Sequence, residues 1–432
     1  MSTSDRPGAL EGVRVVEFAQ AMAIPTCGLL LADMGANVIK VEPPAGDAFR
    51  HTQEPLFPGE AKGYIVLNRG KRSICLDVAS ADARDAVERL VRWADIVLVS
   101  LKPADLPRYR MTYEDFRALN DQVIYLEHVP VGSKGPMGGD PGYDVVVQGM
   151  SGTAAITART RGDAPINVRP AFADMGTGYL SALAVVAALR HRDLTGEGQR
   201  VETSLLATAL ASANQLVSWF DATDPPRKAA FDAEVKDARS WGAGFEDQRT
   251  IWEKHFLRGG FANIYFRHYR TADGFISIGC LSPSLNARFR KVTGIHDPRT
   301  EPDFDLGAPG AIGRLTKTME EAEKLLASRT TAAWMEAFRA GGVPCGKLNF
   351  PPEVFDDPQI VENEYVVEIE HPVLGAFKTF APPIRMDATP TRVQSPPPML
   401  DQHTDEVLAE LGYGDDVIAS MRAAGVAGRS SH

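Results

Sequence analysis

The sequence predicts an α/β protein with a doubly wound, Rossmann-like large domain and a smaller α+β domain. Short runs rich in valine and isoleucine alternate with helical patterns up to about residue 215, as in Val13–Phe18, Asn37–Val41 and Ile96–Ser100. After Asn214 this alternation stops, and charged and aromatic residues follow without a clear period. We therefore divide the chain into residues 1–215, a linker and small domain at 216–349, and a return segment at 350–432 that completes the large domain.

Composition narrows the classes of function. The chain has 432 residues, a formal net charge of −10, 44% hydrophobic residues and 24% charged residues. These values are typical of a globular protein and argue against a nucleic-acid-binding surface. The first residues lack the apolar run of a secretory signal, and no stretch approaches the roughly 20 apolar residues of a membrane helix.

The four cysteines are far apart in the chain and show no CxxC spacing: Cys27, Cys75, Cys280 and Cys345. This pattern indicates reduced thiols and a cytoplasmic protein, and it offers no zinc site or other metal site.

The N-terminal segment predicts a βαβ unit. The strand Val13–Phe18 precedes an apolar helix that ends near Gly35, and the strand Asn37–Val41 ends in Glu42. An acidic residue at that place can bind a ribose in dinucleotide-binding proteins. The first loop reads AQAMAIPTCG and lacks the GxGxxG pattern, so a nicotinamide enzyme is not expected.

The remaining elements follow in order. We expect strands at 74–76, 96–100 and 123–127, helices at 81–93 and 113–119, and an irregular segment at 218–267. A hairpin at 269–279 turns at Asp273-Gly274, and helices at 284–292 and 319–339 complete the small domain. Strands at 365–380 and an amphipathic helix from Thr404 close the chain.

The stretch Pro170–Leu205 carries the most distinctive chemistry. Asp174 is followed by two spaced glycines, Gly176 and Gly178, and then by the apolar run Tyr179–Leu189. We expect a loop, a buried helix, a turn and a strand, with Asp174 near the positive end of the helix dipole. On these residues alone, a helix N-cap is the favoured explanation of Asp174.

Three basic features suit a phosphorylated ligand: Lys71-Arg72 after a loop, Arg108 near Lys102, and the loop Gly132–Tyr143. Cations at the carboxyl edge of a parallel sheet lie where such folds bind anions. The alternative for each feature is a solvated charge run, and Tyr143-Asp144 is equally the start of a plain strand.

The order of several segments resembles one known family. The segments are LEGVRVVEF, LLADMGANVIKVEPPAGD, NRGKRSICLD, ADIVLVS, PGYDVVVQGMSG, ADMGTG, ALRHRDLTGEGQRVETSL, YRTADGFISIG, GVPCGKLN, DDPQI and LDQHTDEVLAELG. They resemble the family III CoA-transferases (CaiB/BaiF), which include formyl-CoA transferase. The resemblance implies an interlocked homodimer whose substrates are an acyl-CoA and a carboxylic acid, with no permanently bound cofactor.

The resemblance also implies roles for individual residues. Asp174 falls on the catalytic nucleophile of the family, and Gly176 and Gly178 are expected to offer N–H groups to a developing oxyanion. The implied CoA contacts are Met22, Ala23, Asn68, Arg69, Lys71, Arg72, Ser100, Leu101, Lys102, Arg108, Asp140, Tyr143 and Asp144. A flap corresponds to Arg258–Phe261, with Gly259 and Gly260, and Arg169 is a candidate for holding the acceptor carboxylate.

Some positions depart from the formyl-CoA enzyme. Met22, Pro43 and Ser100-Leu101 replace residues near its reaction centre, which argues against formate or oxalate as substrates. The aromatic segment around Trp241, Phe245 and Trp252 is instead a candidate for substrate selection.

Two alternatives stay open. Related α-methylacyl-CoA racemases pair the aspartate with a histidine, and Tyr143 stands in its place here. A tyrosine is a poor base at neutral pH, so transfer is favoured over racemisation. An inactive CoA-binding paralogue is the third reading.

Overall fold

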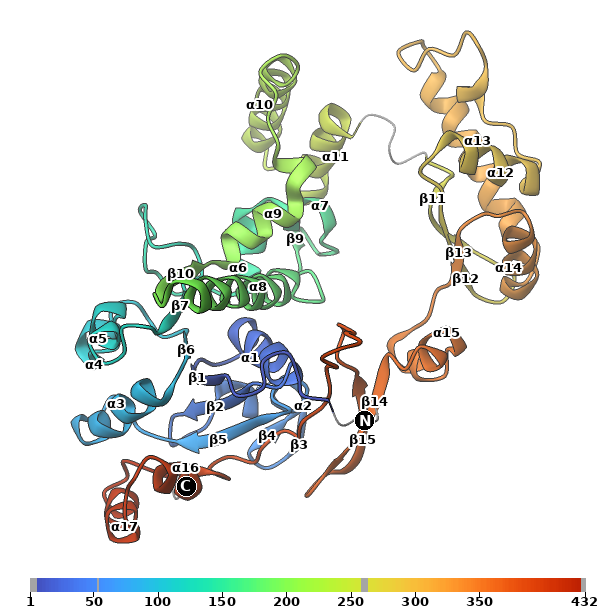
Figure 1. The fold of residues 1–432 in the computed structure, drawn as a ribbon. Helices are drawn as coiled ribbons and strands as arrows, with labels where there is room; N and C mark the ends of the chain where they lie inside the picture. The colour runs from blue at the N-terminus through green and yellow to red at the C-terminus, as the bar shows by residue number, and fades with distance from the viewer. Residues whose placement is uncertain (1–5, 53, 258–262, 429–432) are drawn as a thin grey trace. The chain divides into compact units, whose positions relative to one another are not determined.

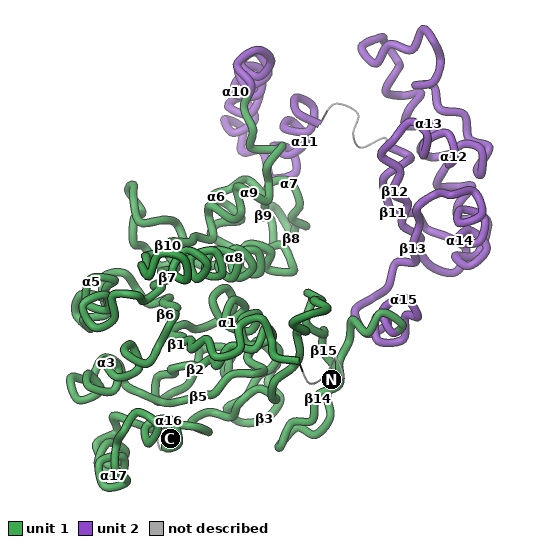
Figure 2. The backbone as a smooth tube through the Cα atoms, in the orientation of Figure 1, with its two compact units in different colours: residues 1–219, 362–432 green, residues 220–361 purple. Residues whose placement is uncertain are grey.

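The computed structural model describes residues 6–52, 54–257 and 263–428 (Figure 1). The chain forms two compact units, residues 1–219 with 362–432 and residues 220–361 (Figure 2). The domain boundaries that we predicted from the sequence fall after residues 215 and 349.

A six-stranded parallel sheet forms the centre of the first unit. Its strand order is β10-β7-β6-β1-β2-β5, and every neighbouring pair is parallel. The strands are β1 Arg14–Phe18, β2 Asn37–Glu42, β5 Lys71–Cys75, β6 Ile96–Val99, β7 Ile124–His128 and β10 Gln199–Thr203. The predicted mixed α/β fold with a parallel sheet is confirmed, and the order reverses between β1 and β6.

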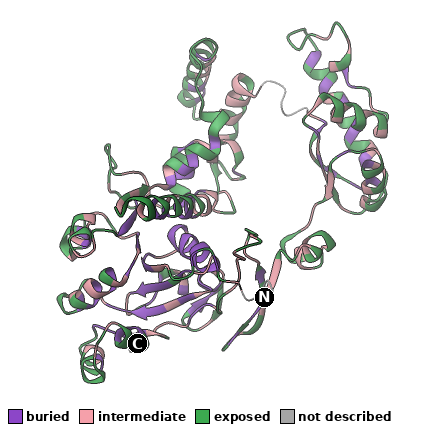
Figure 3. Cartoon of the chain, in the orientation of Figure 1, coloured by how far each residue is buried: buried purple, intermediate pink, exposed green. Residues whose placement is uncertain are grey.

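Both faces of this sheet are covered, which explains the continuous apolar strands. In β1, Val15 packs on the side of helix α1 (Ala23–Asp33), whereas Val16 packs on the side of α3 (Arg84–Trp93). Successive side chains of a strand point to opposite faces, so a central strand such as β1 contributes to two cores. Figure 3 shows the strands and α1 as mostly buried.

The remaining elements of the first unit are shorter, except for one long helix. They are β3 Pro55–Phe57, β4 Glu60–Ala61, α2 Lys62–Ile65, α4 Leu106–Tyr109, α5 Tyr113–Arg117, α6 Asp144–Met150, α7 Thr153–Thr157, β8 Thr160–Arg161, β9 Ala164–Pro165, α8 Phe172–Thr195, α9 Leu205–Val217, β14 Val366–His371, β15 Gly375–Phe380, α16 Thr404–Glu410 and α17 Asp415–Ala423.

Two expectations for this unit were wrong. The segment that begins at Tyr143-Asp144 is the helix α6 rather than a strand, because Val147 packs with Ala173 of α8 and Leu205 and Ala209 of α9 and not in a sheet. Asp174 is not the N-cap that the sequence allowed, because α8 begins at Phe172, and Asp174 and both glycines lie inside it.

The second unit contains the helices α10 (Asp224–Ser240) and α11 (Phe245–Phe256), where the sequence suggested an irregular segment. A three-stranded antiparallel sheet follows, formed by β11 (Phe266–Arg270), β12 (Phe275–Gly279) and β13 (Cys345–Lys347). The predicted hairpin is confirmed. The second unit also contains the helices α12 Pro283–Thr293, α13 Ala311–Leu326 and α14 Thr331–Ala340. Helix α15 Pro358–Glu362 contains the residues at which the chain passes from the second unit back to the first.

Helix α8 is long and apolar enough to cross a membrane by length and composition. In the structure it packs against α1, and Ala182, Val185 and Leu189 join the same apolar core as β1 and β7. This packing is that of a core helix.

Candidate active site

A cavity of about 670 Å³ lies at the carboxyl edge of the parallel sheet. The loops after β1, β2, β5, β6 and β7 supply most of its wall, and the first turns of α8 and α9 supply the rest. Ligands of open parallel sheets bind at this edge, next to the point where the strand order reverses. The lining residues are Gln20, Ala21, Met22, Ala23, Pro43, Ala48, Phe49, Thr52, Asp77, Val78, Ala79, Ser100, Leu101, Lys102, Pro103, Asp105, Tyr109, His128, Pro130, Asp140, Pro141, Gly142, Tyr143, Asp174 and Leu205.

Asp174 lies in the first turn of α8 and lines this cavity. It does not cap its own helix. Asp144 at the start of α6 does so, because its Oδ1 accepts hydrogen bonds from the backbone N–H groups of Ala173 (3.0 Å) and Asp174 (3.3 Å). The Asp174 carboxylate has no hydrogen bond to any residue that the structure describes, so it is available to a ligand.

The electrostatics of Asp174 follow from this arrangement. Burial in the cavity wall raises the pKa of Asp174 to about 7, and the negative charge of Asp144 contributes to the same shift. A carboxyl group with such a pKa is a stronger base, and it is about half ionised at neutral pH. Shifts of this kind, at a group lining a cavity, are common in catalytic residues.

The two glycines after Asp174 serve helix packing. A Cβ on Gly178 would lie 2.6 Å from the backbone oxygen of Ala23 and 2.6 Å from Cβ of Thr26, both on α1. A Cβ on Gly176 would lie 2.8 Å from a methyl group of Thr208 on α9. Since both residues are within α8, their N–H groups belong to its hydrogen-bond ladder, and the expected oxyanion role does not fit.

Eight of the predicted site residues line the cavity together. They are Met22, Ala23, Ser100, Leu101, Lys102, Asp140, Tyr143 and Asp174. Their positions span the connections after β1, β6 and β7 and the first turn of α8, so the sheet edge brings distant segments into one site.

Four predicted CoA contacts lie outside the cavity, and their side chains are used in the fold. Arg69 makes a bidentate ion pair with Asp33, and Arg72 pairs with Glu406 and Glu410 on α16. Lys71 is fully buried and donates to Glu17 (2.9 Å), to the backbone oxygen of Pro25 (2.8 Å) and to Asn68 (2.9 Å).

Burial lowers the pKa of Lys71 to about 8, although the neighbouring Glu17 opposes this shift. Asn68 also donates to the backbone oxygen of Tyr64. Asn68, Arg69, Lys71 and Arg72 therefore do not line the cavity that contains Asp174.

The remaining predicted residues are spread around the site. Arg108 is exposed and pairs with Asp105 and the Tyr109 hydroxyl, both of which line the cavity, so it lies beside the rim. Asp144 has the capping role described above, and Arg169 is exposed and does not line the cavity. Gly259 and Gly260 fall outside the described residues.

A buried charge network supports one wall of the cavity. Lys40 Nζ contacts Glu17 Oε1 (2.9 Å), Asp47 Oδ2 (2.8 Å) and the backbone oxygen of Ala19 (2.7 Å). Asp47 in turn accepts from the N–H of Ala21, which has a left-handed φ of 67°. This network holds the strained loop after β1 against the loop after β2.

His128 is a cavity residue that the sequence analysis missed. It is the last residue of β7 and only 5% exposed, and its Nδ1 has no hydrogen-bond partner among the described residues. Burial lowers the pKa of its imidazole to about 4. The available signal was position, since the predicted strand ended one residue earlier, at the edge where ligands of parallel sheets bind.

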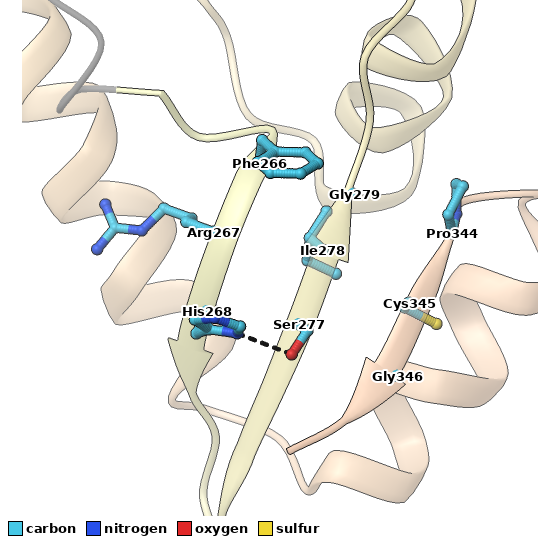
Figure 4. Close-up of a pocket in the computed structure, with 9 residues that line it drawn as sticks. All are labelled: Phe266, Arg267, His268, Ser277, Ile278, Gly279, Pro344, Cys345 and Gly346. Atoms are coloured by element: carbon cyan, nitrogen blue, oxygen red, sulfur yellow. Dashed lines mark hydrogen bonds between the residues drawn. The ribbon is translucent and has the colours of Figure 1, made fainter. Parts of the chain in front are cut away.

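A second cavity of about 570 Å³ lies in the second unit, along β11, β12 and β13. Figure 4 shows its lining, in which the His268 ring shares a hydrogen bond of 2.8 Å with the Ser277 hydroxyl. None of the predicted site residues lies there. Within the described part of the chain, no group of three or more His, Cys, Asp or Glu side chains is placed to hold a metal ion.

The sequence model of CoA-transferase family III matches residues 10–404 of this chain. The chain belongs to CoA-transferase family III. It is 33% identical over 423 residues to a succinate–glutarate CoA-transferase of Agrobacterium fabrum, covering 94% of this chain and 96% of that protein. It is 28% identical over 428 residues to a formyl-CoA:oxalate CoA-transferase of Streptomyces coelicolor, covering 97% and 99%.

Solved structures agree with this assignment. A CAIB/BAIF family protein from Brucella suis matches with a TM-score of 0.72 at 27% identity, covering 94% of this chain and all of that one. Rv3272 from Mycobacterium tuberculosis matches with a TM-score of 0.73 at 26% identity, covering 93% and 100%. This family III protein is therefore an enzyme, a CoA-transferase, and CoA thioesters are its class of substrate.

Proposed function

We propose that this enzyme transfers CoA from an acyl-CoA to a free carboxylic acid through covalent intermediates on Asp174. The observation that carries the proposal is the position of one carboxylate. Asp174 lines the cavity at the sheet edge, and its own helix is capped by a different residue. Its carboxylate is therefore free for nucleophilic attack.

The first half of the reaction loads the enzyme. An oxygen of ionised Asp174 attacks the thioester carbonyl, the C–S bond breaks, and CoA leaves as a thiolate, which gives a mixed anhydride. The thiolate then attacks the aspartyl carbonyl of the anhydride and expels the first carboxylic acid as its anion. Asp174 now carries CoA as a thioester.

The second half transfers CoA to the acceptor. The carboxylate of the acceptor acid attacks the aspartyl thioester, releases the thiolate and forms a second anhydride. The thiolate attacks the acceptor carbonyl, which gives the new acyl-CoA and regenerates the Asp174 carboxylate. Anhydrides and thioesters hydrolyse, so the site must limit water during these steps.

The raised pKa of Asp174 suits this chemistry. A carboxylate with a pKa of about 7 is more basic than an ordinary aspartate and is a better nucleophile toward a thioester. The pKa still lies close enough to neutrality that a large fraction of the enzyme is ionised.

The wall of the cavity offers contacts for the carrier. We assign the phosphate groups of CoA to Lys102, in the wall, and to Arg108, beside the rim. Met22, Ala23, Ser100, Leu101, Asp140 and Tyr143 line the path between those cations and Asp174 in this proposal.

The proposal is tested with a panel of acyl-CoA donors and intact-mass detection of the protein. We expect at least one donor to give a CoA adduct that is lost in Asp174→Ala and in Asp174→Asn. Affinity for free CoA should change by less than about twofold in both variants, because neither removes a phosphate contact. Full transferase activity in Asp174→Ala would contradict the mechanism.

Racemisation is tested in the same samples. Proton exchange at the α-carbon of a branched acyl-CoA in D₂O is expected to be absent, because Tyr143 stands where the racemases have a histidine. Deuterium incorporation that depends on Asp174 would favour the racemase.

We also propose that the enzyme is a cytoplasmic homodimer. Helix α8 and its neighbour α9 leave several large apolar side chains exposed on the single chain, among them Leu183 (67%), Leu194 (66%) and Leu216 (53%). A surface of this kind is typical of an interface. The wide spacing of the four cysteines, with no CxxC pattern, supports a reducing compartment. Light scattering should give twice the mass of the chain, and a monomer at micromolar concentration would contradict the dimer.

A further inference from the structure

His128 is a buried polar group that the proposed mechanism leaves unused. Its side chain lies on the α8 side of the sheet, because Ile124 and Leu126 of the same strand join the core formed with α1 and α8. At His128 the strand ends and the cavity begins. The imidazole thus continues a row of core side chains into the wall of the site.

His128 is connected to α8 through the neighbouring strand β10. His128 pairs with Thr203 across β7 and β10, and the Thr203 hydroxyl hydrogen-bonds Ser181 on α8 (3.0 Å). Asp174 lies two helical turns before Ser181, or about 10 Å along the helix axis. His128, at the end of β7, and Asp174, in the first turn of α8, thus line the same cavity from different elements.

The ring nitrogen of His128 that lacks a hydrogen bond is unfavourable in free energy, and a ligand that supplies the hydrogen bond removes this penalty. Nδ1 of His128 is buried and has no partner in the described part of the chain. A buried polar atom without a hydrogen bond is unfavourable, so a substrate group that supplies one gains affinity over a group that cannot.

The charge state of His128 selects the kind of group. Burial keeps the imidazole neutral near pH 7, and no charged side chain offsets this effect. Placing a carboxylate beside a neutral, desolvated ring costs more than placing a hydroxyl or an amide there. A hydroxyl or an amide also fits either tautomer, because each of these groups both donates and accepts hydrogen bonds.

We propose that His128 is a specificity-determining contact, which hydrogen-bonds an uncharged hydroxyl or amide of the bound acyl-CoA. The inference rests on the proposed function of Asp174. The group comes from one of two sources, a hydroxyl on the acyl chain or an amide of the pantetheine arm, and the experiment separates them.

The test compares His128→Leu with wild type in a single-turnover loading assay at Asp174. Leucine keeps an apolar side chain of similar size and removes the hydrogen bond. The donors are butyryl-CoA, 3-hydroxybutyryl-CoA and succinyl-CoA, and the affinity for free CoA is measured in parallel. His128→Asn retains a donor and an acceptor, and His296→Leu removes an exposed imidazole in the second unit as a matched control.

A hydroxyl contact predicts that His128→Leu loses about tenfold in loading from 3-hydroxybutyryl-CoA and less than about twofold from butyryl-CoA. A pantetheine contact predicts an equal loss of about tenfold for every donor and for free CoA. In both cases His128→Asn should recover part of the loss, and His296→Leu should equal wild type.

Two outcomes overturn the proposal directly: unchanged loading of all donors in His128→Leu, or a loss of loading that is confined to succinyl-CoA. A third is the absence of any recovery in His128→Asn, provided that both variants keep the wild-type melting temperature. If His128→Leu does not fold, the same comparison is made with His128→Phe, which keeps a flat ring and removes the hydrogen bond. Unchanged loading of all donors in His128→Phe then overturns the proposal. Failure of the proposed function looks different, because no donor would load the wild-type enzyme.

Discussion

Replacing Asp174 with asparagine should stabilise the ligand-free enzyme, and more so at high pH. Burial and the charge of Asp144 raise the pKa of Asp174 from 3.8 to about 7 in the folded chain. The folded state therefore binds this proton more tightly than the unfolded state does. As the pH rises from about 4 to about 7, the wild-type enzyme loses stability through this group.

The size of the effect follows from the shift. About three pKa units at about 1.36 kcal/mol each give a penalty of about 4 kcal/mol at pH 8, which is an upper bound. At pH 5 the folded carboxyl is protonated, and the remaining penalty is about 1.5 kcal/mol. Asparagine carries no charge and avoids both penalties. A stability change of about 1 kcal/mol shifts the melting temperature of a protein of this size by about 2 °C. The melting temperature of Asp174→Asn should therefore exceed that of wild type by up to about 8 °C at pH 8 and by about 3 °C at pH 5.

The assay is thermal unfolding of wild type and Asp174→Asn without CoA across pH 5 to 8.5. Asp163→Asn, which changes an exposed aspartate in a turn of the same unit, is the control and should not alter the pH dependence. An equal gain for Asp174→Asn at both ends of the range, or a loss at pH 8, would refute the claim that this carboxylate is desolvated.

Three other predictions follow from the same structure. The rate at which a donor loads CoA onto Asp174 should rise about tenfold per pH unit below about pH 7 and level off above it, because only the ionised carboxylate attacks. Single-turnover loading at a saturating donor concentration measures this rate. A rate that does not change with pH would contradict the prediction. Gly178→Ala should destabilise by about 1–3 kcal/mol in urea unfolding, since its Cβ meets the Ala23 backbone, whereas Gly149→Ala in α6 has open space and should be neutral or stabilising. Lys40→Met should cost about 3–5 kcal/mol, because it leaves the buried carboxylate of Asp47 without a cation and leaves Glu17 with Lys71 alone. An unchanged urea midpoint would argue against the buried network.

The parallel sheet was predictable because its central strands are buried on both faces. A run such as Val13–Phe18 has few interpretations other than a central strand, and the alternation of such runs with helices determines the class of fold. The hairpin at Asp273-Gly274 was predictable for a similar reason, because local turn chemistry specifies it.

The errors came from interactions between distant segments. The glycines after Asp174 suggested a loop, but they are required where α8 meets α1 and α9, and that contact joins residues far apart in the sequence. The capping of α8 by Asp144 from α6 was likewise invisible, so Asp174 itself seemed a candidate cap.

The roles of the basic residues were also not predictable from the sequence. A cation in a sequence is equally a phosphate ligand or half of an ion pair, and only the fold shows that Lys71 faces Glu17 while Lys102 faces the cavity. His128 was missed because a single histidine at a strand end carries no motif.

The most direct test of the account is the chemical trapping of the intermediate. The enzyme is incubated with a donor acyl-CoA and hydroxylamine, digested, and mapped by mass spectrometry. We predict a single hydroxamate, on the peptide that contains Asp174, and none in Asp174→Asn. Turnover of the donor without any such adduct, or a hydroxamate on another residue, would contradict the central claim that Asp174 carries CoA during transfer.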